Sequence, residues 1–114
     1  MEPSEESVLY TSGKHILILG GDLGKGRLQE LKTTLQPASL RWDAGWDTRR
    51  VHHLADAIKA GSVDLVILLV RFLNHNASTT IVAAAKASSV VCVTVRNGRS
   101  ASQIAAELTR TGKQ

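Results

Sequence analysis

The chain has 114 residues, of which 43% are hydrophobic and 4% aromatic, and its formal net charge is +4. This length is typical of one domain, and the apolar residues suffice for a core of Leu, Ile, Val and Ala. No apolar run reaches the roughly 18–20 residues of a membrane span, and the acidic start does not resemble a secretory signal. We expect a cytoplasmic protein, because the single Cys92 cannot form a disulfide within the chain.

The charge is unevenly distributed along the chain. Residues 1–13 contain Glu2, Glu5 and Glu6 and no Lys or Arg, so they carry −3, while 14 basic and 7 acidic residues give residues 14–114 a charge of +7. We expect residues 1–13 to be a flexible acidic tail and residues 14–114 to be a single domain. A basic domain favours an anionic partner, although the charge alone is also explained by a solvated surface.

The first predicted elements after the tail are a strand and a helix. Residues 14–19 form a continuous apolar run that two glycines end, which is typical of a strand covered on both faces. Residues 25–36 place Leu28, Leu31 and Leu35 on one side of a helix. Pro37 ends this helix, because proline disfavours the helical conformation in the residue before it.

The second pair of elements is a weaker strand and a clear helix. In residues 38–43, Leu40 and Trp42 alternate with Arg41 and Asp43, which indicates a half-exposed edge strand. Asp47 or Thr48 is suited to cap the following helix, and Gly61 to end it. The inward positions of this helix recur at helical spacing and are Val51, Leu54, Ala55 and Ile58.

Two further strand and helix pairs follow. Residues 63–73 predict the strongest strand, and Asn74 or Asn76 is suited to cap an alanine-rich helix over residues 77–87. Residues 90–95 predict the fourth strand, which contains Cys92 as a packed residue. A capping box formed by Ser100 and Gln103 then opens a last helix, whose inward residues are Ile104, Ala105 and Leu108.

Alternation of buried strands and helices predicts the α/β class, with a parallel sheet between two helical layers. We expect a three-layer α/β/α sandwich of the Rossmann or flavodoxin-like kind, with right-handed crossovers and a four-stranded parallel sheet in the order 2-1-3-4. The fourth strand then forms an apolar edge. Since bare edges promote pairing, we expect a homo-oligomer, such as a dimer, or another protein that covers this edge.

Three loops are expected to meet at the carboxyl edge of this sheet, where such folds bind ligands. They combine glycines, helix starts, amides and basic residues, which favour a phosphate or another oxyanion. The alternative is that the glycines form a tight turn without a ligand. The predicted ligand-binding residues are Gly20, Gly21, Asp22, Gly24, Lys25, Arg71, Asn74, His75, Asn76, Arg96, Arg99 and Ser100.

The glycine loop does not match the standard nucleotide motifs. Only three residues separate Gly20 from Gly24, where the Walker motif has four, and Gly26 stands where that motif has Ser or Thr. The Gly-x-Gly-x-x-Gly pattern of dinucleotide-binding proteins is also absent. The sequence therefore indicates neither a Walker-type ATP site nor an NAD site, and the cofactor stays unknown.

His75 is the candidate for catalysis, as a general base or nucleophile, and the alternative is that it packs or caps locally. His52 and His53 are adjacent and point about 100° apart on a helix, so we expect no metal site. Trp42 and Trp46 lie among arginines, which fits either single-stranded nucleic acid or packing and an oligomer contact. We favour packing, because two nearby aspartates would repel phosphates.

The run Asp-Leu-Val-Ile-Leu-Leu-Val-Arg-Phe-Leu-Asn-His-Asn at residues 64–76 resembles the central motif of a small bacterial family, catalogued as domain of unknown function 2325. Residues 19–22, Leu-Gly-Gly-Asp, resemble the end of that family's first strand, and Arg99 and Ser100 resemble the cap before its last helix. The resemblance covers roughly residues 14–108 but not residues 42–50. It implies a compact Rossmann-like domain with the Asn-His-Asn segment at its functional edge, and no established reaction.

The leading hypothesis is a non-enzymatic binding or regulatory module for a phosphate-bearing small molecule, a nucleotide included. The first alternative is an oligomerising interaction protein of a larger assembly, with nucleic acid as a weakly supported partner. The second alternative is an enzyme that uses His75 on a phosphoester. No feature indicates a membrane partner.

Overall fold

The structure, a computed structural model, describes residues 13–21, 24–70, 73–96 and 104. Its strands and helices alternate along the chain, and the strands form one four-stranded parallel sheet in the order β2-β1-β3-β4. This confirms the predicted fold class and strand order. The elements are β1 (His15–Leu19), α2 (Gly24–Leu35), β2 (Ser39–Asp43), α3 (Thr48–Lys59), β3 (Leu65–Leu69), α4 (His75–Ala87) and β4 (Val91–Val95).

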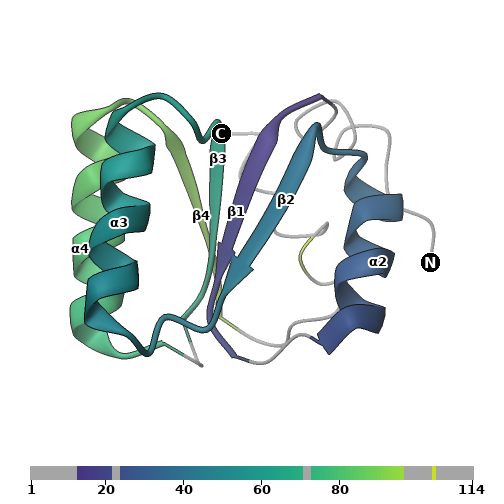
Figure 1. The fold of residues 1–114 in the computed structure, drawn as a ribbon, viewed down its shortest axis with the longest axis horizontal. Coiled ribbons are helices and arrows are strands. Elements are labelled where there is room, and N and C mark those ends of the chain that lie inside the picture. Colours follow the sequence, from purple (N-terminus) through teal and green to yellow (C-terminus); the bar gives the residue numbers. More distant parts are fainter. Residues whose placement is uncertain (1–12, 22–23, 71–72, 97–103, 105–114) are drawn as a thin grey trace.

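Helices cover both faces of the sheet, with α3 and α4 side by side on one face and α2 on the other (Figure 1). The central strands β1 and β3 send alternate side chains into the two helical layers, as the period of two along a strand requires. Ile16, Ile18, Ile67 and Leu69 join Leu31 and Leu35 of α2 in one core cluster, which also contains Ile104. Leu17, Leu19, Val66 and Leu68 join the buried residues of α3 and α4 in the other cluster.

The register brings the carboxyl ends of all four strands to one edge of the sheet. Leu19 at the end of β1 is aligned with Asp43 of β2 on one side and with Leu68 of β3 on the other. The last residue of β3, Leu69, is aligned with Val95 of β4. The segments that follow the strands therefore begin at this common edge.

Short polar side chains define where α3 and α4 begin. Asp47 caps α3, and Asn74 caps α4, so in each case the first of the two predicted residues is the cap. Helix α4 begins at His75, the start that a cap at Asn74 gives, and it contains the predicted alanine-rich residues 77–87. Gly61 follows the end of α3 with a φ of +87°, a conformation that glycine adopts without strain.

Two expectations for the strands were wrong. The third strand does not extend to Leu73, because β3 ends at Leu69 and the Leu73 N–H turns back to donate to the Val70 carbonyl at 3.3 Å. Asp43 shares a side of β2 with the exposed Arg41, as the alternation predicts, but it is not exposed, since only 7% of its surface is accessible. Its carboxylate is buried because it has partners in the next segment of the chain, as shown below.

Several predicted features lie outside the described residues. They are most of the acidic tail, the capping box of Ser100 and Gln103, and the inward positions Ala105 and Leu108. Among the described helices, none is both long and apolar enough to cross a membrane.

The close approach of β1 to β3 predicts that Gly20 is much less replaceable than Gly61. A Cβ at Gly20 would lie 2.7 Å from the Leu69 carbonyl oxygen, and φ is +118°, whereas a Cβ at Gly61 would meet open space. We expect Gly61→Ala to cost about 1–2 kcal/mol of unfolding free energy, from conformational strain alone, and Gly20→Ala to cost clearly more. Urea denaturation of both variants measures this, and equal losses would contradict the steric argument.

Candidate functional site

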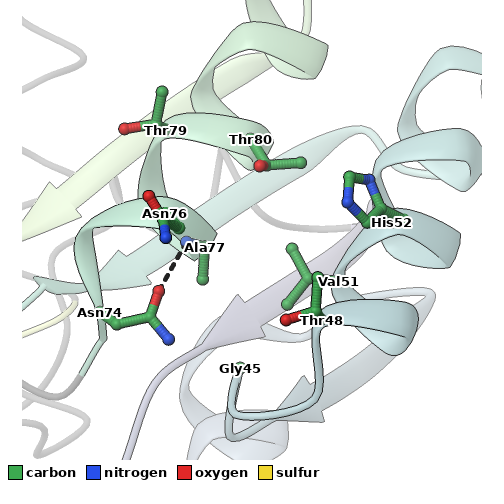
Figure 2. Close-up of a pocket in the computed structure, with 9 residues that line it drawn as sticks. All are labelled: Gly45, Thr48, Val51, His52, Asn74, Asn76, Ala77, Thr79 and Thr80. Atoms are coloured by element: carbon green, nitrogen blue, oxygen red, sulfur yellow. Dashed lines mark hydrogen bonds between the residues drawn. The ribbon is translucent and has the colours of Figure 1, made fainter.

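A cavity of about 360 Å³ opens at the carboxyl edge of the sheet, between the first turns of α3 and α4 (Figure 2). Its volume is within the range of about 300–1,000 Å³ that is usual for small-molecule sites. Residues of the β2–α3 loop and of both helices line it, and they are Gly45, Thr48, Val51, His52, Asn74, Asn76, Ala77, Thr79 and Thr80.

The α3 side of the cavity is formed by residues that share one face of the helix. Thr48, Val51 and His52 are three and four residues apart, so they lie above one another on the helix surface. Val51 is buried in the core, whereas Thr48 and His52 are exposed. The Asp47 carboxylate accepts the N–H groups of Arg49 at 2.9 Å and Arg50 at 3.4 Å. These bonds cap α3 and define where the helix begins.

The α4 side is formed by the same spacing in the following helix. Asn76 and Thr80 are four residues apart, and Ala77 packs beneath them in the core. The Asn74 side-chain oxygen accepts the Ala77 N–H at 2.7 Å. No acceptor for the N–H groups of His75 and Asn76, which lie at the positive end of this helix, is found among the described residues.

Asp43 anchors the loop that joins β2 to this cavity. One carboxylate oxygen accepts the Gly45 N–H at 2.8 Å, and the other is 2.8 Å from Nε of Arg50 in the first turn of α3. The backbone carbonyl of Asp43 accepts the Gly20 N–H at 2.9 Å, which ties the end of β1 to the same residue. One buried side chain thus sets the positions of Gly45 and of the start of α3.

The described lining of the cavity combines polar and apolar groups, and none of its described residues is a carboxylate, a lysine or an arginine. It offers threonine hydroxyls, asparagine amides and the His52 imidazole, which are groups that hydrogen-bond to a polar or anionic ligand. Within the described part of the chain, no group of three or more His, Cys, Asp or Glu residues is placed to hold a metal ion.

The structure brings only some of the predicted site residues to this cavity. Asn74 and Asn76 line it, while His75, the first residue of α4, is exposed between them and does not. Gly20 and Gly21 are buried at the end of β1. Both backbone groups of Gly20 are used within the fold, because its carbonyl also accepts the indole N–H of Trp42 at 3.0 Å.

The remaining predicted residues lie elsewhere or outside the described residues. Gly24 and Lys25 begin α2, on the face of the sheet opposite to α3 and α4. Arg96 is exposed directly after β4. The residues outside the described part of the chain are Asp22, Arg71, Arg99 and Ser100.

Sequence reasoning missed the cavity residues Thr48, His52, Thr79 and Thr80. A signal for them was present, because right-handed crossovers in a sheet of order 2-1-3-4 place the second and third helices on one face. Polar residues four apart at both helix starts, Thr48 with His52 and Asn76 with Thr80, then predict a shared polar opening.

The other residues singled out by sequence differ in their surroundings. Trp42 is partly buried against the core and held by its bond to Gly20, whereas 75% of the surface of Trp46 is exposed. Burial raises the pKa of the Cys92 thiol from 9.0 to about 11. Cys92 is therefore protonated near neutral pH and a poor nucleophile there.

Comparisons with protein-family models, with curated proteins and with solved structures found no match to this chain. The resemblance to domain of unknown function 2325 therefore stays a prediction.

The anchoring role of Asp43 predicts a graded response to substitution. Asp43→Asn keeps an oxygen for the Gly45 N–H but loses the ion pair with Arg50, whose exposed guanidinium can turn to solvent, so we expect a small loss of stability. Asp43→Ala leaves the buried N–H without an acceptor, and we expect a further loss of roughly 1–3 kcal/mol. Chemical denaturation of both variants measures the difference. Equal stability of the two would show that the Gly45 hydrogen bond does not anchor the loop.

Proposed function

We propose that the protein is a non-enzymatic binding module that holds a phosphate-bearing small molecule in the cavity between α3 and α4. The observation that carries this proposal is the convergence of two helix starts, with their hydroxyl, amide and imidazole groups, on one opening that no carboxylate of a described residue lines. Phosphate groups favour such positions, because unpaired N–H groups and the helix dipole attract negative charge.

The donors available to an anion are unequal on the two sides of the cavity. On α3, the Asp47 carboxylate already occupies the N–H groups of Arg49 and Arg50. On α4, Asn74 is neutral, and the N–H groups of His75 and Asn76 have no described acceptor. We therefore assign the phosphate to the α4 side, with the His52 imidazole opposite it. The charge of +7 on residues 14–114 favours the approach of an anion.

Binding is favoured over catalysis by the surroundings of the two histidines. A general base needs a fixed position before a suitable pKa matters. Neither His52 nor His75 has a hydrogen bond to its ring from any described residue, and His75 does not line the cavity. No described arrangement therefore singles out a nucleophile and base pair at this edge.

The proposal predicts that phosphate compounds stabilise the protein through the cavity residues. At a ligand concentration about 100 times the dissociation constant, the free energy of unfolding rises by roughly 2.7 kcal/mol. Inorganic phosphate, pyrophosphate and ribose 5-phosphate are the probes in a thermal unfolding assay. We expect His52→Ala on α3 and Asn76→Ala on α4 to reduce the stabilisation, because both side chains line the cavity.

The matched control is His53→Ala, because His53 is exposed next to His52 but does not line the cavity. Phosphate also stabilises proteins without binding a site, through exclusion from the surface. The measured quantity is therefore the difference between the unmodified protein and each cavity variant. If this difference is zero, or if His53→Ala produces the same change, the proposal is wrong.

Self-association is a second proposal, favoured by the exposed position of Val91. This residue begins β4, the last strand of the described sheet, and 54% of its surface is accessible. Exposed apolar edge strands pair readily, and a charge at such an edge opposes pairing. We expect a dimer by light scattering at high protein concentration and a monomer for Val91→Lys. A monomeric mass for the unmodified protein would contradict this.

A further inference from the structure

Trp46 is next to the cavity in sequence but does not line it, and its side chain is exposed to solvent. It lies in the β2–α3 loop between Gly45 and Thr48, and both of these residues line the cavity. With 75% of its surface accessible, it is one of two large hydrophobic side chains exposed among the described residues. An exposed indole contributes little to the core, so the fold does not explain this tryptophan.

The backbone on each side of Trp46 is held in place. The Gly45 N–H is bonded to Asp43, and a Cβ at Gly45 would lie 2.5 Å from Cδ2 of Leu73, so this part of the loop is closely packed. On the other side, the Asp47 side chain caps α3. The loop therefore presents the indole from fixed points, which reduces the conformational cost of binding a ligand against it.

The surroundings of Trp46 favour a small molecule over a protein surface. Its neighbours Asp47, Thr48 and Arg49 are polar and exposed, whereas a hot spot for a protein partner is normally surrounded by other contacts that exclude water. The other exposed large hydrophobic residue, Val91, lies at the amino end of β4, so it is at the opposite edge of the sheet from Trp46.

A row of stacked bases, as in single-stranded nucleic acid, requires more than one exposed aromatic residue. Trp42 does not supply the second one, because its indole is partly buried and donates to the Gly20 carbonyl. A single exposed aromatic side chain, close in sequence to a cavity that offers polar groups, fits a ligand that has one planar ring and one polar group.

We infer that the ligand is a mononucleotide, with its base stacked on Trp46 and its phosphate between α3 and α4. This inference rests on the proposed function, because it assigns the phosphate to the same cavity. It adds a role for Trp46 as the residue that distinguishes a nucleotide from a simple sugar phosphate. Arg49, exposed in the first turn of α3, adds a positive charge to this helix start.

The test compares AMP with ribose 5-phosphate by isothermal titration calorimetry, since the two differ only by the base. Stacking of a base on an aromatic side chain contributes about 1–3 kcal/mol, which corresponds to roughly 5- to 150-fold in affinity. We expect AMP to bind tighter than ribose 5-phosphate by a factor in this range. Trp46→Ala removes this preference and leaves the affinity for ribose 5-phosphate unchanged, while Trp46→Phe keeps part of the preference.

Val91→Ala is the matched control, because it removes the other exposed apolar side chain, far from the cavity, and is expected to keep the preference for AMP. If the unmodified protein binds both compounds equally, or if Trp46→Ala keeps the preference, the inference is wrong while the phosphate site stands. If neither compound binds, the inference and the proposed function are both wrong. The unfolding midpoint of Trp46→Ala shows whether this variant is folded. If it is not folded, Trp46→Phe tests the inference, because it keeps an aromatic ring and is expected to keep part of the preference for AMP.

Discussion

The buried carboxylate of Asp43 is the interaction on which the geometry of the carboxyl edge depends. Its backbone carbonyl holds the end of β1 through Gly20, and its side chain holds Gly45 and Arg50. These contacts hold the β2–α3 loop, which contains Trp46, against the start of α3. Only 7% of Asp43 is accessible to solvent, so this arrangement depends on satisfied hydrogen bonds, because a buried charge without partners is strongly unfavourable. The position of the β2–α3 loop at the candidate site therefore depends on the hydrogen bonds of this buried residue.

The position of the cavity is related to the close packing at the carboxyl ends of the two central strands, β1 and β3. Open α/β sheets commonly bind ligands where the strand order reverses, which in this sheet is between β1 and β3. Here that position is filled: Gly20 lies directly against Leu69 and Leu73, and Leu73 also contacts the β2–α3 loop at Gly45. The described cavity lies to one side, between α3 and α4, where Thr48, Asn76 and Thr80 supply short polar side chains.

The sequence predicted that the glycine loop and the Asn-His-Asn segment form one functional edge. In the structure they lead to helices on different faces of the sheet. The glycine loop after β1 leads to α2 on one face, and the Asn-His-Asn segment leads to α4 on the other face (Figure 1). Among the described residues of these two segments, Asn74 and Asn76 line the cavity and those of the glycine loop do not. The backbone of Gly20 serves the fold, since its N–H and carbonyl both bond to the end of β2.

Local patterns were enough to predict much of this protein. Continuous apolar runs predicted β1 and β3 because both faces of these strands are covered, and helical spacing predicted the buried face of α3, Val51, Leu54, Ala55 and Ile58. Asn74 and Asn76 were predicted at the functional edge because a strand end and a helix start meet there. Each of these features depends on residues that are close in the chain, and the strand order then follows from right-handed crossovers.

The tertiary structure decided what local patterns do not contain. The burial of Asp43 depends on Arg50 and on the Gly45 N–H, so the alternating strand pattern predicted its side correctly but its exposure wrongly. His52 of α3 and Asn76 of α4 line the same cavity because the two helices pack side by side. The sequence by itself determined which faces are apolar, because burial follows the period of each element. Only the tertiary structure decided which polar groups face one another, because that depends on how the elements pack.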